Sequence, residues 1–239
     1  MMGKNLPFFT NPEKMGSRSF IYEKVFGVFK RRKNVIDRFH KLYYTSEDET
    51  WKNTFWLGTP TQKCPLDLWI YQEIIFNIKP DAIIECGTYG GGSALFLASI
   101  CDLLSHGEII TIDIKSMEGR PKHKRITYLL GSTTSQEILE KVQAFVKNKN
   151  RVMVILDSDH NKEHVLKELE IYSQFVSKNS YLIVEDTNIN GHPVEPDFGP
   201  GPMEAVEEFL EGNKDFVIDT SKEKFYMTFS PNGFLKRAS

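Results

Sequence analysis

Residues 81–98 read DAIIECGTYGGGSALFLA, and this stretch is the strongest indication of the fold in the chain. A short apolar run ends in the acid Glu85. Glycines follow at 87 and 90–92, and an apolar pattern of helical period begins near Ser93. The pattern predicts a buried strand, a tight loop and the N-terminus of a helix. Free backbone N–H groups and the positive end of the helix dipole meet at such a junction, which favours a nucleotide-like ligand.

Strand and helix patterns alternate along the chain from residue 66 onward. Four further apolar runs read as strands, at residues 108–113, 125–130, 151–157 and 181–185. Continuous apolar runs are typical of strands buried on both faces, and the alternation predicts a doubly wound parallel α/β sheet. Two late runs, 216–219 and 224–229, predict an antiparallel pair that closes a seven-stranded sheet.

The first 65 residues lack this alternation and read as a separate extension. Residues 19–42 predict one amphipathic helix, and residues 43–65 predict an aromatic-rich loop that either lines a site or pins the extension to the domain. Residues 1–41 hold ten Lys and Arg against three Asp and Glu, a net of +7 that leaves −9 for the rest of a chain whose total is −2. We expect a helical and loop arm over 1–65, an α/β domain over 66–239, and a homo-oligomer that could form through the arm.

The composition argues against several classes of protein. A net charge of −2 gives no reason to expect a nucleic-acid partner. No apolar run approaches the roughly 20 residues that a membrane helix needs, and no signal-peptide core is present at the start. The three cysteines are scattered, without a CxxC pair, which favours a reducing compartment. We therefore expect a soluble, cytoplasmic protein without a membrane partner.

Carboxylates end four of the five predicted parallel strands. They are Glu85, Asp113, Asp157, and Glu185 followed by Asp186. In an open α/β sheet the ligand lies outside the carboxyl ends of the strands, so these acids face one crevice. Each acid alone could instead cap the following helix, but four of five strands indicate a site.

Asp113 stands where nucleotide-binding folds place an acid that accepts hydrogen bonds from ribose hydroxyls. A dinucleotide fingerprint would read GxGxxG, whereas residues 87–92 read GTYGGG and place Tyr89 where the second glycine should be. An acid such as Glu85 before the first glycine is unfavourable beside a pyrophosphate, but it suits a cationic ligand. S-adenosylmethionine, with its ribose, ammonium and sulfonium groups, therefore fits better than NAD.

Asp157, Glu185 and Asp186 form a second acidic group on strands that should be neighbours. With no Lys or Arg near them in the sequence they would repel one another, unless a cation lies among them or one of them is protonated. Oxygen ligands favour a hard ion, Mg²⁺ or else Ca²⁺ or Mn²⁺, which would lower the pKa of a substrate hydroxyl. His160, three residues after Asp157, is either a general base or a helix-capping or surface residue.

Several motifs together resemble the cephalosporin hydroxylase/rhamnosyl O-methyltransferase family over about residues 55–235. The matching segments are IECGTYGGGS (84–93), TIDI (111–114), LDSDH (156–160), VEDT (184–187) and DFGPGPMEAV (197–206). The resemblance implies a Rossmann-like methyltransferase sheet. It also implies an S-adenosylmethionine-dependent, Mg²⁺-assisted O-methyltransferase acting on a hydroxyl of a small molecule, such as a sugar, a glycoside or an antibiotic-like metabolite.

The resemblance also implies roles for single residues. Asp157, Glu185 and Asp186 would bind Mg²⁺, and His160, assisted by Asp157, would be catalytic. Some relatives place a metal-binding acid one residue after Asp157, where this chain has a serine, so Asp159 could share the metal role. The residues implied to bind the cofactor are Glu85, Gly87, Thr88, Tyr89, Gly91, Ser93, Asp113, Ser132 and Asp157.

Two other functions stay open on the residues alone. The first is an NAD- or nucleotide-sugar-dependent oxidoreductase, which Asp113 allows and Tyr89 disfavours. The second is a non-catalytic module that only binds the cofactor, against which the intact set of Asp157, His160, Glu185 and Asp186 argues. The methyl acceptor is not identified by any motif in the chain.

Overall fold

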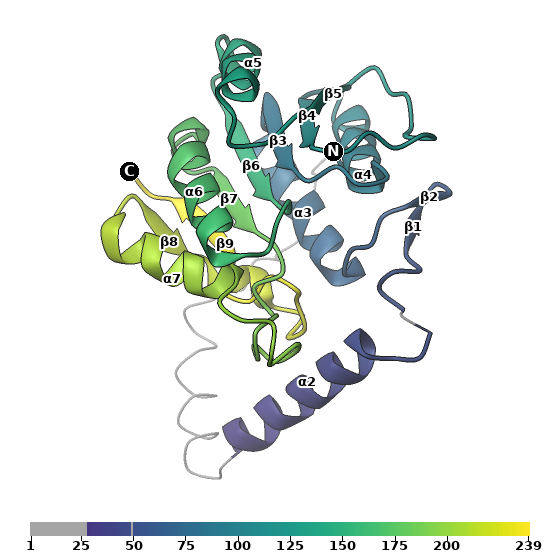
Figure 1. The fold of residues 1–239 in the computed structure, drawn as a ribbon, viewed down its shortest axis with the longest axis vertical. Helices are drawn as coiled ribbons and strands as arrows, with labels where there is room; N and C mark the ends of the chain where they lie inside the picture. Colours follow the sequence, from purple (N-terminus) through teal and green to yellow (C-terminus); the bar gives the residue numbers. More distant parts are fainter. Residues whose placement is uncertain (1–27, 49) are drawn as a thin grey trace, which may run out of the picture.

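A computed structural model describes residues 28–48 and 50–239 (Figure 1). Its first helix, α2 (Val28–Tyr44), leads through a loop to the short antiparallel strands β1 (Phe55–Trp56) and β2 (Thr59–Pro60). The helix predicted over 19–42 therefore agrees with α2 from residue 28, and its earlier part lies outside the described residues. In Figure 1, α2 lies apart from the sheet and the helices that cover it.

The remaining elements alternate as the sequence predicts. The helices are α3 (Pro65–Ile78), α4 (Gly92–Leu103), α5 (Gln136–Val146), α6 (Lys162–Tyr172) and α7 (Pro202–Gly212). The strands are β3 (Ala82–Cys86), β4 (Glu108–Asp113), β5 (Ile126–Leu130), β6 (Val152–Leu156), β7 (Tyr181–Val184), β8 (Phe216–Ile218) and β9 (Phe234–Arg237). Two 3₁₀ turns, η1 (Ser173–Phe175) and η2 (Thr220–Glu223), complete the described elements.

Seven strands form one sheet in the order β5-β4-β3-β6-β7-β9-β8. Strands β3 to β7 are parallel, and β9 pairs antiparallel with both β7 and β8. The predicted doubly wound, seven-stranded fold is confirmed. One predicted strand is wrong. Residues 224–229 do not pair with β8, whose partner in the sheet is β9. The alternating apolar residues of that run include Met227 and Phe229, which are buried against the arm instead of pairing in the sheet.

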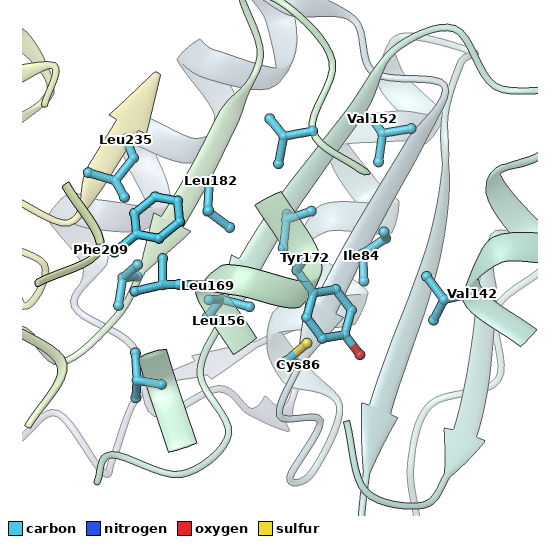
Figure 2. Close-up of a cluster of buried hydrophobic side chains, with 14 of the residues drawn as sticks. Ile84, Cys86, Val142, Val152, Leu156, Leu169, Tyr172, Leu182, Phe209 and Leu235 are labelled. Atoms are coloured by element: carbon cyan, nitrogen blue, oxygen red, sulfur yellow. The ribbon is translucent and has the colours of Figure 1, made fainter. Parts of the chain in front are cut away.

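The core lies on both faces of the sheet. Ile84 of β3 packs in a cluster with residues of α5, α6 and α7, part of which is drawn in Figure 2. Its neighbour Ile83 packs in a second cluster with residues of α3 and α4. Successive side chains of a strand point to opposite faces of the sheet. A strand whose successive residues are all buried must therefore be covered by helices on both faces. This explains why the central strands read as continuous apolar runs.

The strand register places the predicted site residues at one level. Cys86 pairs with Ile112 on one side and with Leu156 on the other. From β3 the chain adds β4 and β5 on one side of the sheet, and it then returns to add β6 and β7 on the other side. The gap between β3 and β6 is therefore the topological switch point of the sheet. The residues that immediately follow these three strand positions therefore surround a crevice outside the carboxyl ends.

Among the helices of residues 28–48 and 50–239, none combines the length and the apolar character that a membrane crossing requires. The three cysteines, Cys64, Cys86 and Cys101, are free thiols, and all of them are buried.

Candidate active site

A cavity of about 750 Å³ opens at the switch point, a volume in the range of small-molecule sites. It is lined by the glycine loop after β3, by the ends of β4 and β6, and by residues of the arm. The predicted site residues that line it are Gly87, Thr88, Tyr89, Ser93, Asp113, Ser132, Asp157, His160 and Asp186. Glu85, Gly91 and Glu185 are not among the lining residues.

Two glycines of the loop are required by neighbouring protein segments. Gly87 has φ of +99°, and a Cβ there would lie 1.8 Å from the carbonyl oxygen of Asp157. A Cβ on Gly92 would lie 2.2 Å from the carbonyl oxygen of Pro60, which belongs to β2 of the arm. Glycines in a loop of this kind can admit a ligand at close range. The structure shows that Gly92 admits the arm and that Gly87 admits the end of β6.

Replacing Gly92 with alanine is therefore expected to destabilise the protein by about 1–3 kcal/mol, because the new methyl group has no room beside the Pro60 carbonyl. The matched control is Gly90→Ala, whose Cβ would stay 3.6 Å from the same carbonyl oxygen, an ordinary contact. Urea unfolding of both variants measures the difference. Equal stability of the two variants would show that the arm does not pack on the loop in this way.

Asp113 braces the glycine loop. Its Oδ2 accepts hydrogen bonds from the backbone N–H of Tyr89 at 2.8 Å and of Thr88 at 3.3 Å. Arg120, which no motif in the sequence indicated, donates to the same oxygen at 3.2 Å and to the Tyr89 carbonyl at 2.8 Å. Asp113 lines the cavity, so it can meet a cofactor, and its role as ribose ligand stays a prediction.

Glu85 lies beneath the loop. Its side chain is buried and accepts a hydrogen bond from the Thr111 hydroxyl at 2.6 Å. Burial raises the pKa of Glu85, and the nearby cation of Lys63 opposes this change. The predicted contact of Glu85 with the cofactor gains no support from the described cavity, because the residue does not line it.

Lys63 supplies the cation that the sequence around the acids lacks. Its amine donates hydrogen bonds to Asp157 and, at 2.6 Å, to Oε2 of Glu185, while its side chain is only 6% exposed. The second oxygen of Glu185 accepts from the Tyr71 hydroxyl at 2.8 Å. The expected repulsion among the acids is therefore compensated in part by the protein itself. Lys63 is 94 residues from Asp157 in sequence, so no local pattern indicates it.

Asp157, His160 and Asp186 form a cluster that could hold a metal ion. One ligand atom from each lies within 4.8 Å of the others. His160 Nε2 is 3.6 Å from Asp157 Oδ1 and 3.3 Å from Asp186 Oδ2. Two carboxylates and an imidazole at one point of a cavity suit a divalent cation. Asp157 and Asp186, both predicted as metal ligands, lie in this cluster, and their role as ligands stays a prediction.

Glu185 and Asp159 do not join this cluster. Glu185 would have to leave Lys63 and Tyr71 to ligate a metal, so its predicted role as ligand finds no support in this arrangement. Asp159 Oδ1 accepts from the backbone N–H of Asn161 at 2.8 Å, next to the start of α6. Asp159 lines the cavity, but its carboxylate is used by the turn before the helix.

The charges of the cluster are set by its neighbours. Burial alone would raise the pKa of Asp157, but Lys63 and His160 lower it to about 2, so the carboxylate is ionised. Burial alone would lower the pKa of His160, but Asp157 and Asp186 raise it to about 9. His160 therefore holds its proton at neutral pH unless another cation compensates the two carboxylates. A cation bound there would make His160 available as a base.

The arm is fastened to the segment that carries Asp186. The side-chain amide of Asn188 donates to Nε2 of His40 in α2 at 2.9 Å. The His40 ring also stacks on Phe229, with centroids 5.5 Å apart. Burial lowers the pKa of His40 to about 4, although Asp37 opposes the change, so the ring is neutral and accepts the hydrogen bond.

Acidification is expected to loosen this junction. The pKa of His40 is about 4 in the folded chain, against the ordinary value of 6.5 that applies once the chain unfolds. Its stabilising contribution is therefore complete above pH 6.5 and is lost as the pH falls from 6.5 toward 4. Between pH 6.5 and about 5 the wild type should lose about 1–2 kcal/mol more stability than His40→Gln, which does not titrate. Urea unfolding at several pH values measures this, and parallel curves would refute it.

The sheet order, the glycine loop, the acid that ends β4 and the cavity at the switch point define a class of protein, the Rossmann-like α/β proteins that bind a ligand outside the carboxyl ends of their strands. A family model described as Rhamnosyl O-methyltransferase/CmcI matches residues 48–238. The chain belongs to this family.

Named relatives agree with this assignment. The chain is 39% identical over 211 residues to the rhamnosyl O-methyltransferase of Mycobacterium bovis (strain BCG / Pasteur 1173P2), covering 85% of each protein. It is 35% identical over 217 residues to that of Mycobacterium leprae, covering 88% of this chain and 93% of the relative. The fold resembles a structure described as "cmcI-D160 Mg-SAM", with a TM-score of 0.60, 19% identity, and coverage of 79% and 78% of the two chains.

The protein is therefore an S-adenosylmethionine-dependent O-methyltransferase. Of the three functions that the residues alone left open, this one is confirmed, and the family assignment argues against the oxidoreductase and the non-catalytic module.

Proposed function

We propose that this protein transfers a methyl group from S-adenosylmethionine to a hydroxyl of a sugar or glycoside, assisted by Mg²⁺. The observation that carries the proposal is the convergence of Asp157, His160 and Asp186 in the cavity that the glycine loop borders. The curated relatives are rhamnosyl O-methyltransferases, and one structure of similar fold is described with Mg and SAM. A rhamnoside is therefore the first acceptor to test.

Each residue of the site has its own role in this proposal. Asp157 and Asp186 would hold Mg²⁺, which lowers the pKa of a substrate hydroxyl when bound. Lys63 keeps Asp157 ionised from its buried side. His160, between the two carboxylates, would take the proton of the acceptor hydroxyl as the oxygen receives the methyl group. The glycine loop and Asp113 would position the methyl donor, which makes transfer effectively unimolecular.

The test is a methyl-transfer reaction with isotopically labelled S-adenosylmethionine and methyl α-L-rhamnopyranoside, analysed by mass spectrometry. We expect labelled product in the presence of MgCl₂, loss of product when EDTA removes the metal, and recovery when Mg²⁺ is added back. Undiminished turnover in EDTA would refute the metal requirement. Failure of S-adenosylmethionine to bind in a calorimetric titration would refute the proposal as a whole.

We also propose a state of assembly and a cellular location. Val35, Phe39 and Leu42 form an exposed apolar stripe on α2, at the spacing of one helix face. This stripe and the basic charge of the arm support a homo-oligomer formed through the arm. Light scattering that finds only monomer over a wide concentration range would refute it. The free, buried thiols support a reducing, cytoplasmic location, which fractionation of the source cells would check.

A further inference from the structure

Two aromatic residues of the arm lie at the wall of the candidate active site. Tyr44, the last residue of α2, and Trp51 of the following loop both line the cavity that contains Asp157, His160 and Asp186. Their rings stack with centroids 5.3 Å apart and an interplanar angle of 18°. The Trp51 indole N–H donates to the Tyr44 carbonyl at 3.1 Å, so the polar edge of the indole is already bonded within the arm.

One aromatic residue, Phe229, contacts both rings of the stacked pair. Both rings meet Phe229 edge-on, Tyr44 at 5.5 Å and Trp51 at 6.2 Å between centroids. Phe229 is buried, and its backbone N–H donates to the buried carboxylate of Asp67 at 2.8 Å. Rings fixed in this way lose little conformational freedom when a ligand packs on them.

Tyr44 and Trp51 are more exposed than the residues that anchor the arm to the domain. His40, Met227 and Phe229 are buried, and none of them lines the cavity. Tyr44 and Trp51 are half-buried and do line it. Packing of the arm therefore explains the buried residues, while Tyr44 and Trp51 keep ring surface at the cavity, and the Lys52 amine lies 5.3 Å from the centroid of the Trp51 ring.

The aromatic pair adjoins the reacting groups. Tyr44 and Trp51 line the same cavity as Asp157, His160 and Asp186. A ligand on the rings would lie beside the carboxylates and His160.

A sugar ring is the ligand that matches these surroundings. One face of a pyranose presents C–H groups that pack on aromatic rings, and its hydroxyls require polar partners. The cavity offers both kinds of contact, with the aromatic pair on one hand and Gln62, Asp157 and Asp186 on the other. We propose that Tyr44 and Trp51 form an acceptor platform, on which a pyranoside ring packs while one hydroxyl reaches Asp157, His160 and Asp186.

This inference rests on the proposed function and deepens it by assigning acceptor selection to the arm. The test compares Trp51→Leu, Trp51→Phe and Tyr44→Leu in the full chain with methyl α-L-rhamnopyranoside. The matched control is Trp69→Leu, because Trp69 is 59% exposed on α3 and does not line the cavity. The readouts are KM for the rhamnoside, kcat, and the calorimetric Kd for S-adenosylmethionine.

We expect Trp51→Leu and Tyr44→Leu to raise KM by about tenfold or more, with kcat and the Kd for S-adenosylmethionine within about twofold of wild type. Trp51→Phe should restore most of the affinity, and Trp69→Leu should match the wild type. An unchanged KM in both leucine variants would overturn the platform. A higher KM accompanied by parallel losses of kcat, cofactor binding and thermal stability would also overturn it, because that result marks a purely structural role.

A binding experiment keeps the two proposals apart. Saturation-transfer NMR of the rhamnoside in the presence of S-adenosylhomocysteine should show transfer from aromatic protons in the wild type and its loss in Trp51→Leu. Binding of this kind without methyl transfer would refute the proposed function and support the platform. Methyl transfer with identical NMR signals in both proteins would refute the platform and support the proposed function.

Discussion

Replacing Lys63 with methionine is expected to destabilise the protein by about 3–5 kcal/mol, the usual consequence of leaving a buried charge without its partner. Lys63 is the cation between Asp157 and Glu185, and its side chain is only 6% exposed. Burial alone would lower the pKa of Lys63, but the two carboxylates raise it, so the amine is a permanent cation. Burial already raises the pKa of Glu185 and Lys63 opposes that change, so without Lys63 the pKa of Glu185 would rise further. Asp157 would also lose the hydrogen bond that orients it.

A double-mutant cycle measures this coupling. The variants are Lys63→Met, Glu185→Gln and the two combined, each unfolded in urea without metal. The amide oxygen of Glu185→Gln can still accept from the Tyr71 hydroxyl, which bonds Glu185 at 2.8 Å. The combined variant should be more stable than the sum of the single effects predicts, because it removes a charge from each side. Strictly additive effects would contradict the assigned pairing.

Replacing His160 with glutamine is expected to lower kcat for rhamnoside methylation by about 10²–10⁴-fold, the range that general-base catalysis contributes. His160 Nε2 lies 3.3 Å from Asp186 Oδ2 and 3.6 Å from Asp157 Oδ1, so it is the titratable base nearest both carboxylates in the described cluster. Glutamine can keep a polar contact with the carboxylates but cannot accept the proton. The Kd for S-adenosylmethionine should change little.

A second histidine provides the control for this variant. His106 pairs with Asp81 at 2.9 Å just before β3, at the end of the strands opposite the cavity. His106→Gln therefore removes an imidazole beside a carboxylate without touching the site, and its kcat should equal that of the wild type. If His160→Gln kept kcat within tenfold of wild type, or if His106→Gln lost as much, His160 would not be the base.

The apolar runs and the acids that follow them were sufficient to predict the sheet and the crevice. Ile83 and Ile84 are both apolar because each faces a different layer of helices. The acids after the strands then had to meet at one edge, since parallel strands end on the same side. This is why the sequence alone predicts that Asp157, Asp186 and the nearby His160 lie together.

The last strand shows where a local pattern fails. Residues 224–229 alternate as a strand does, yet Met227 and Phe229 are buried against the arm and the strand forms over Phe234–Arg237 instead. Alternation records which side of a segment is buried. It does not record whether a sheet or a helix covers that side.

The sequence by itself determined the fold class, the edge of the sheet that holds the site, and the acids and histidine that meet there. Only the tertiary structure decided how the acids are compensated and what covers them. Lys63 and Tyr71, which precede β3 in the sequence, donate hydrogen bonds to Glu185. The arm brings Tyr44 and Trp51 to the cavity. The physical reason is that periodicity and strand-end chemistry act between near neighbours in the chain. Charge pairing and packing act between neighbours in space, and folding brings those together from distant parts of the sequence.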